Sequence, residues 1–544
     1  MSEPYIFQAK PKPVYETDGV DAIFALVALV IGFCFWNWLW PRRGEYEVTC
    51  SPQYEGANCL THMDHLASVA VTAFFILALA ASLTYFHLKK VHLSVGAIVG
   101  VVLLVAGALP FTLFAPTPFF LVLFAAEMVG FLVWHAWASC KRVGGLDGYM
   151  ITDALNQCLV VPLTHLGAWF APFRALLKGR TKVSHVLIAL LGLVVAFPLI
   201  ALVVVLLMAA DQGFDAWMGA AAELFESVDL GRWVWCLVFG LPVAFFAFGI
   251  WWAGVTGEKS GLTRDGTAST LARMRRLAPS AIIAPLTILV AVYILFFAAM
   301  GSYLFSAFTS DLPADYTYAE YARRGFFELA AVAGINFAVM GFAYLFARRK
   351  MVEQTGNGPA SESSVFARYP TVLRVLGAAL SLLTILLIAT SISKMVLYIS
   401  AYGLTQLRVY VLGFEAVLGL VFLLILVRHF VRYDVSRPIV VLVIAAILGM
   451  SWANIDKVVA DWDVDHCLSG STEKVDVGYL ASLSDAALPA LYRLADDSPA
   501  LADTVHTALG HRGLAYGVES VYIKDIPWTS WNVQSNAAKD LGPS

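Results

Sequence analysis

The chain has 544 residues, of which 59% are hydrophobic and only 14% are charged, and its mean hydropathy is +0.74. A soluble domain carries about 25% charged residues, so these charges are too few to cover the surface of a soluble protein this long. This composition excludes a soluble enzyme, a disordered chain and a secreted disulfide scaffold. The net charge of −3 offers no basic surface to nucleic acid. We expect an integral membrane protein.

Eleven apolar stretches are long enough to cross a bilayer as helices, because one span needs roughly 20 residues. The period-two alternation of membrane strands is absent from them. The sequence therefore predicts an all-α polytopic membrane bundle. The predicted spans are Ala22–Trp40, Leu66–Phe86, Ser94–Phe114, Phe119–Ala138, Val186–Ala209, Trp233–Ala253, Ala281–Phe305, Gly325–Phe346, Val375–Tyr398, Tyr410–Val427 and Ile439–Ile455.

Lysine and arginine gather in alternate connections between these spans, the pattern of cytoplasmic loops. We expect the N-terminus to be cytoplasmic and the C-terminus extracytoplasmic. Residues 1–21 would form a cytoplasmic tail, residues 22–455 the transmembrane domain, and residues 456–544 an acidic extracytoplasmic domain. Within the transmembrane domain, residues 150–177 are interrupted by polar residues and proline, which is typical of an interfacial or re-entrant segment.

Two cysteines, Cys50 and Cys59, lie in the first predicted outer loop. In an oxidising compartment they could form a disulfide, and two free thiols are the alternative. In the acidic tail, Asp476–Ala495 and Pro499–Leu509 have the apolar spacing of helices, whereas Asp461–Cys467 is interpreted as a turn.

Ionisable residues gather around the eighth, ninth and tenth spans. Each costs about 2.5–3.5 kcal/mol inside a membrane and usually has a partner or a function. Lys394 and Glu415 lie at similar depth on either side of a tight turn at Gly403. Ion pairs that only fix packing are one interpretation, and a ligand site is the other. Basic residues dominate, which favours an anionic ligand. The candidate ligand residues are Arg323, Arg324, Glu328, Lys394, Tyr398, Arg408 and Glu415.

No nucleotide-binding, hydrolase, zinc-protease or dinucleotide motif occurs in a suitable context. The sequence predicts no catalytic residue, no metal site and no cofactor. Three functions stay open: transporter-like handling of an anionic solute or lipid headgroup, a membrane sensor or regulatory subunit, and an envelope enzyme acting on a lipid-linked substrate. The expected partners are membrane lipids, the anionic ligand and, for a regulatory subunit, a protein at the basic cytoplasmic loops.

Two motifs, YAEYARRGFFEL at Tyr318–Leu329 and KMVLYISAYGLTQLR at Lys394–Arg408, resemble a family of bacterial multi-pass membrane proteins of unknown function. The tail segment Val475–Leu491 is similar to the C-terminal element of that family, whereas Asp461–Cys467 departs from its pattern. The resemblance implies a bacterial inner-membrane protein and supplies no activity.

Overall fold

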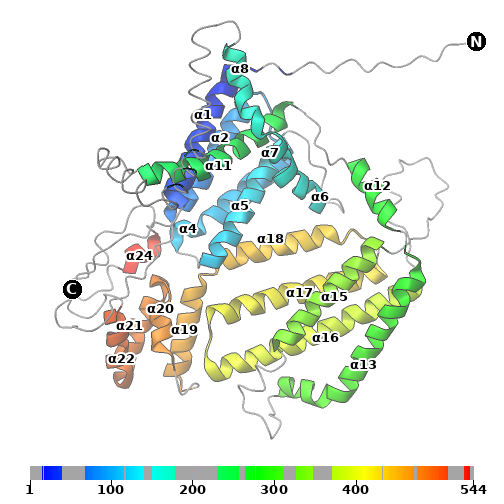
Figure 1. Cartoon of the computed structure of the whole chain (residues 1–544). Helices are drawn as coiled ribbons and strands as arrows, with labels where there is room; N and C mark the ends of the chain where they lie inside the picture. Colours follow the sequence, from blue (N-terminus) through cyan, green and yellow to red (C-terminus); the bar gives the residue numbers. More distant parts are fainter. Residues whose placement is uncertain are drawn as a thin grey trace, which may run out of the picture.

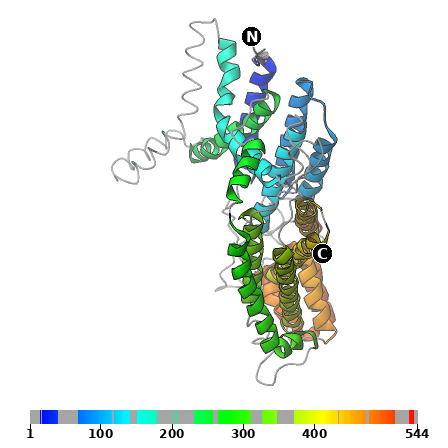
Figure 2. The same cartoon turned by 90° about the vertical axis from the view of Figure 1, so that its right-hand side faces the viewer.

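The computed structural model of the chain is helical and has no β-strand in the part of the chain that it describes. Figures 1 and 2 agree that the helices from the first half lie at one end of the molecule and those from the second half at the other. The structure describes residues 15, 17–39, 68–114, 118–139, 150–177, 200, 203, 207, 230–256, 264–275, 277–309, 326–346, 371–431, 433–470, 475–511 and 532–538.

The N-terminal lobe surrounds an aromatic-rich core to which α1, α2, α5 and α11 all contribute. Its elements are α1 (Gly19–Cys34), the π-helix η1 (Phe35–Leu39), α2 (Val69–Leu88), α3 (Val95–Ala108), α4 (Pro110–Leu113), α5 (Pro118–Ser139), α6 (Met150–Leu155), the π-helix η3 (Asn156–Val160), α7 (Val161–Thr164), the 3₁₀-helix η4 (Leu166–Phe170), α8 (Ala171–Leu177) and α11 (Leu230–Thr256).

The C-terminal lobe is an array of long apolar helices, and a set of shorter helices follows it in the chain (Figure 1). The lobe contains α12 (Arg264–Met274), α13 (Pro279–Thr309), α15 (Phe326–Phe346), α16 (Thr371–Tyr402), α17 (Gln406–Phe430) and α18 (Ser436–Trp452). The shorter elements are α19 (Ile455–Leu468), α20 (Val477–Ser482), the 3₁₀-helix η5 (Asp485–Ala487), α21 (Leu488–Asp497), α22 (Pro499–His511) and α24 (Val533–Ala538). We call α19 to α22 the C-terminal helices.

Among the described residues, eight helices are long and apolar enough to cross a membrane, or nine if the bent pair α18–α19 forms one span. Eight of the eleven predicted spans coincide with these helices. The eighth predicted span is α15, whose apolar part runs only over Glu328–Ala343. The fifth predicted span, Val186–Ala209, lies almost wholly outside the described residues. The prediction of an all-α polytopic bundle is therefore confirmed.

Two glycines allow α1 and α11 to pack in backbone contact. A Cβ atom on Gly240 would lie 2.7 Å from the carbonyl oxygen of Gly32, and one on Gly32 would overlap the carbonyl oxygen of Gly240. Small residues are the usual means by which membrane helices approach this closely. The two helices are consequently among the most extensively packed pairs of the lobe.

Residues 150–177 form five short consecutive helical elements, of which α7 and η4 pack against α11, α8 packs against α1 and η3 packs against α5. Trp169 is 1% exposed and donates an indole hydrogen bond of 2.8 Å to the carbonyl oxygen of Ala25 in α1. Pro162 and His165 direct carbonyl oxygens at Gly249 of α11, at 3.3 and 3.4 Å from the position of a Cβ atom there. The segment is therefore part of the packed lobe from η3 to α8.

The last predicted span ends earlier than expected, because the chain bends by 64° between α18 and α19. Asn454 makes this bend with a positive φ of 43°, a conformation that asparagine tolerates better than most residues. The predicted turn at Asp461–Cys467 is wrong: α19 continues to Leu468. Val459, Ala460 and Val464 are completely buried on one face of this helix, and this packing outweighs the turn-forming tendency of its aspartates.

The predicted helix over Asp476–Ala495 is also interrupted. α20 ends at Ser482, and the short 3₁₀-helix η5 follows it. α21 then begins at Leu488, and Pro489 lies in its first turn, where proline is favoured. The break lets Leu480, Leu491 and Leu494 all enter one core, each of them 0% exposed. The second predicted tail helix is present as α22.

Candidate functional site

The hairpin of α16 and α17 carries the buried polar residues at the centre of the candidate site. The two helices pack along each other, and Gly403 between them adopts the positive φ of +79° that the tight turn requires. Ser391 of α16 donates a hydrogen bond of 2.6 Å to Oε1 of Glu415 in α17. Both side chains are 1% exposed. The turn therefore brings the polar faces of the two helices together.

Lys394 lies on the same face of α16 as Ser391, about 4.5 Å nearer the turn along the helix axis. Its side chain is 1% exposed. Glu328 of α15 is exposed and close enough to interact electrostatically with this ammonium. Glu415 forms no ion pair with Lys394, since Oε1 accepts from Ser391 and Oε2 has no hydrogen-bond partner among the described atoms. A Lys394–Glu415 packing pair is therefore not formed.

Arg408 and Tyr398 lie together at the turn end of the hairpin. The guanidinium of Arg408 stacks 4.3 Å from the centre of the Tyr398 ring, and Tyr398 contacts Tyr402 with 5.1 Å between ring centres. Nη1 of Arg408 donates to the carbonyl oxygens of Tyr402, at 3.1 Å, and of Gly403. These contacts fix the arginine over the last turn of α16, where a cation complements the negative end of the helix dipole.

Side chains of the C-terminal helices accept hydrogen bonds from the backbone of this turn. Oδ1 of Asp463 accepts from Leu404 N–H at 2.6 Å, and the hydroxyl oxygen of Tyr479 accepts from Gln406 N–H at 2.9 Å. The carboxylate of Asp456 accepts a hydrogen bond from the side-chain amide of Gln406 and another, of 2.9 Å, from the backbone N–H of Ser484. Three side chains of the tail thus hold the hairpin that carries Lys394 and Glu415. None of these three contacts was predicted from the sequence.

Apolar contacts reinforce the same junction. Met395, Ile399 and Leu404 from the hairpin belong to one buried cluster with Val459 and Leu491 from the C-terminal helices. The end of α16 is therefore part of the core of the tail.

Asp463 makes this junction sensitive to pH. Burial raises the pKa of Asp463 to about 6, against the opposing effects of Leu404 N–H, Arg408 and His466, while Asp476 acts in the same direction as burial. A raised pKa means that the folded protein holds this proton more tightly than the unfolded chain does. The resulting stabilisation is complete below the ordinary value of 3.8 and is lost as the pH rises through about 6.

We therefore expect the wild-type protein to lose about 3 kcal/mol of stability from this group between pH 4 and pH 7. In Asp463→Asn the neutral amide keeps an oxygen for Leu404 N–H and should remove that part of the pH dependence. Thermal unfolding of both proteins across this range measures the effect. Equal pH dependence in the two proteins would refute the role of Asp463.

A second buried polar group lies deeper in the C-terminal lobe. Tyr293 of α13 donates 2.8 Å to Oδ1 of Asn336 in α15, and Nδ2 of Asn336 donates 2.9 Å to Thr384 in α16. Asn336 and Thr384 are 0% exposed. Interhelical hydrogen bonds of this kind hold membrane helices in register. This group was not predicted from the sequence, although an asparagine at the centre of an apolar span could have indicated it.

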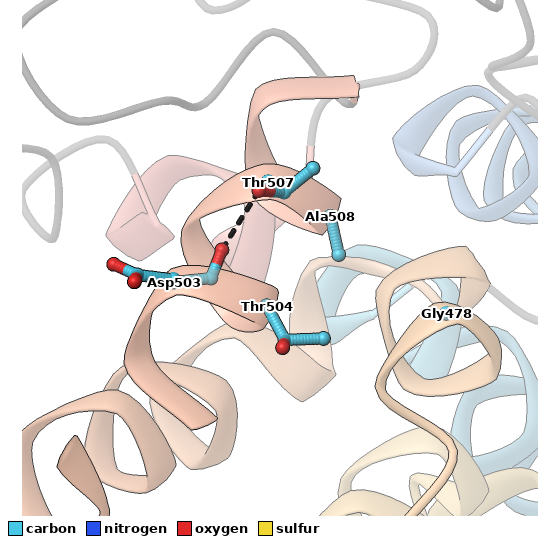
Figure 3. Close-up of a pocket in the computed structure, with 5 residues that line it drawn as sticks. All are labelled: Gly478, Asp503, Thr504, Thr507 and Ala508. Carbon is cyan, nitrogen blue, oxygen red and sulfur yellow. Dashed lines mark hydrogen bonds between the residues drawn. The ribbon is translucent and has the colours of Figure 1, made fainter. Parts of the chain in front are cut away.

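A hollow of about 400 Å³ lies on the C-terminal helices, between α20 and α22 (Figure 3). Gly478 lines one side, and four residues of α22 line the other; Asp503 points away from Gly478, and its carbonyl oxygen accepts a 2.8 Å hydrogen bond from Thr507. None of the predicted ligand residues lines this hollow.

The structure thus brings Lys394, Tyr398, Arg408 and Glu415 to one hairpin and leaves Glu328 exposed beside it. The predicted ligand residues Arg323 and Arg324 lie outside the described residues. So do Cys50 and Cys59, the predicted disulfide. The structure adds Ser391 to the candidate ligand residues, because its hydroxyl group donates a hydrogen bond to Glu415.

The apolar helices and the charges buried between them define a multi-pass helical membrane protein. Within that class, the chain belongs to the family described as Domain of unknown function (DUF4153), which matches residues 97–356 and 363–494. The resemblance to a family of unknown function is therefore confirmed. No curated protein and no solved structure matches the chain.

Proposed function

We propose that this chain is a transporter-like protein of the bacterial inner membrane that handles an anionic solute or lipid headgroup at the α16–α17 hairpin. The observation that carries the proposal is the burial of Lys394, 1% exposed within a membrane-spanning helix. A cation is costly at such a position and is usually retained for a functional reason. A phosphate or carboxylate group is the kind of ligand that a lysine ammonium binds through charge-assisted hydrogen bonds.

The surroundings of Lys394 fit such a ligand. Arg408 stands at the turn end of the same hairpin and uses Nη1 for backbone carbonyls, while the guanidinium group has five N–H donors in all. Lysine and arginine donors at two depths of one hairpin suit an anion that moves between them. The distribution of basic loops supports an extracytoplasmic position for this end of the hairpin.

Native mass spectrometry of the purified protein tests the proposal. Lys394→Met should retain at least about tenfold less co-purified anion than the wild type, because it keeps the length of the side chain and removes the charge. Lys457→Met is the matched control, since Lys457 is 53% exposed and pairs with Asp461 at 2.5 Å.

An anion that the wild type and Lys457→Met retain and Lys394→Met loses would support the proposal. Equal retention by all three proteins, or no bound anion in any of them, would contradict it. The thermal stability of each protein shows whether the variants are folded.

A sensor or regulatory subunit is the second candidate, and the grip of the C-terminal helices on the hairpin turn favours it. Asp463 and Tyr479 bind backbone N–H groups directly, so a movement of the tail would move α16 and α17. Such a protein would bind its ligand and a partner protein without net transport. Ligand uptake by reconstituted vesicles separates the two functions.

A further inference from the structure

Glu415 is a buried carboxyl group that the packing of the hairpin leaves half satisfied. Oε1 accepts the Ser391 hydrogen bond, while Oε2 is buried without a hydrogen-bond partner among the described atoms. The side chain is 1% exposed in a membrane-spanning helix. A carboxylate in such a place, with one neutral donor, is strongly disfavoured relative to the protonated acid.

Few charges face this group from the elements around it. On α16 the nearest charged residue in sequence is Lys394, which forms no ion pair with Glu415. On α15 it is the exposed Glu328, and on α17 it is Arg408, which is held at the turn. α18 approaches α17 through Met450, near Gly413, and carries its one charged residue at the opposite end. No described cation neutralises an ionised Glu415.

We infer that Glu415 is a proton-binding residue of the anion site, so that the anion and a proton bind together. The inference rests on the proposed function. The step is a protonation equilibrium: the carboxylate takes one proton on Oε2 and becomes a neutral acid, with no other bond made or broken. Glu415 is hydrogen-bonded to Ser391, which precedes Lys394 by three residues on the same face of α16. Protonation of Glu415 removes a negative charge from this part of the hairpin and favours an anion. Loss of the proton restores the negative charge and weakens anion binding.

Infrared spectroscopy of the full chain in phospholipid vesicles tests the protonation directly. The spectrum of the wild type minus that of Glu415→Gln at pH 6 should contain the carbonyl band of a protonated carboxylic acid. Ser391→Ala should keep this band at a higher frequency, because the hydrogen bond to Oε1 is lost. Asp497→Asn, a change of an exposed carboxyl group at the end of α21, should leave the band intact.

A difference spectrum without this band at pH 6 would overturn the inference. Glu127 of α5 also has both carboxyl oxygens buried without a described hydrogen-bond partner, so Glu127→Gln serves as a second background. It removes any contribution of that residue to the band.

Native mass spectrometry tests the coupling. The amount of anion bound to the wild type should decrease about tenfold between pH 6 and pH 9. Glu415→Gln, a neutral mimic of the acid, should retain the same amount of anion at both pH values. Equal pH dependence in the two proteins would overturn the coupling. An anion that Lys394→Met loses but that shows no dependence on Glu415 would leave the proposed function standing and refute this inference alone.

Discussion

Gly240→Ala is expected to separate α1 from α11 and to destabilise the N-terminal lobe by about 1–3 kcal/mol or more. The added Cβ would lie 2.7 Å from the carbonyl oxygen of Gly32 and 2.9 Å from its carbonyl carbon. Both are backbone atoms, so a side-chain rotation cannot relieve the overlap. Either the helices move apart or the aromatic core between them is repacked. Thermal unfolding in detergent measures the loss.

Gly334→Ala is the matched control for this prediction. Gly334 also lies in an apolar helix, α15, and among the described residues no atom outside the backbone of that helix lies within 4 Å of the place where its Cβ would stand. The same added methyl group should therefore leave the stability unchanged or raise it slightly, because alanine favours the helix. Equal melting temperatures for the wild type and Gly240→Ala would show that the contact between the two helices does not determine stability.

Asp21→Ala is expected to cost about 3–5 kcal/mol, the range for breaking a buried ion pair by removing one partner. Asp21 is 0% exposed and lies 2.7 Å from Nζ of Lys89. It also accepts hydrogen bonds from the hydroxyl groups of Tyr15 and Tyr85, at 3.0 and 2.9 Å. The substitution leaves these donors in the interior of the lobe, and only Asp18 continues to pair with Lys89, at 2.8 Å.

Lys89 reports on the same cluster. Burial opposes its charge, but hydrogen bonds to Asp18, Asp21 and Tyr15 outweigh burial and hold the pKa of Lys89 above its usual range. In Asp21→Ala, Asp18 and Tyr15 still favour the charged lysine, but the contribution of Asp21 is lost while burial continues to oppose the charge. Asp461→Ala is the comparison, because its pair with Lys457 is exposed and should contribute under about 1 kcal/mol. Equal losses in the two variants would contradict a special role for the buried pair.

Hydropathy alone was enough to predict most of the transmembrane fold. A membrane helix must be apolar over its whole length, so each span is visible without knowledge of its neighbours. The contacts between spans are different, because they depend on single atoms. Gly32 and Gly240 are two glycines among many, and Lys89 contributed only to the count of basic loop residues. Their partners lie far away in the sequence, and no local pattern identifies them.

The candidate site was predictable where its geometry follows from one short turn. Only six residues lie between Tyr398 and Thr405 across the tight turn, and this short connection fixes the antiparallel register that brings Glu415 opposite Ser391 of α16. The sequence could not show that Glu415 pairs with Ser391 and not with Lys394. This choice depends on the rotation of each helix about its own axis. The contact of Asp463 with Leu404 was missed for a different reason, because Asp461–Cys467 was interpreted as a turn and not as part of a helix.

The shared core of the hairpin and the C-terminal helices also dictates an order of assembly. Met395, Ile399 and Leu404 enter the membrane environment with α16, but Val459 and Leu491, which cover them, are synthesised later. Until the tail has emerged, the hairpin presents an uncovered apolar face and unpaired N–H groups at Leu404 and Gln406. The contacts of the hairpin turn are therefore completed only after the residues up to Leu491 have been synthesised.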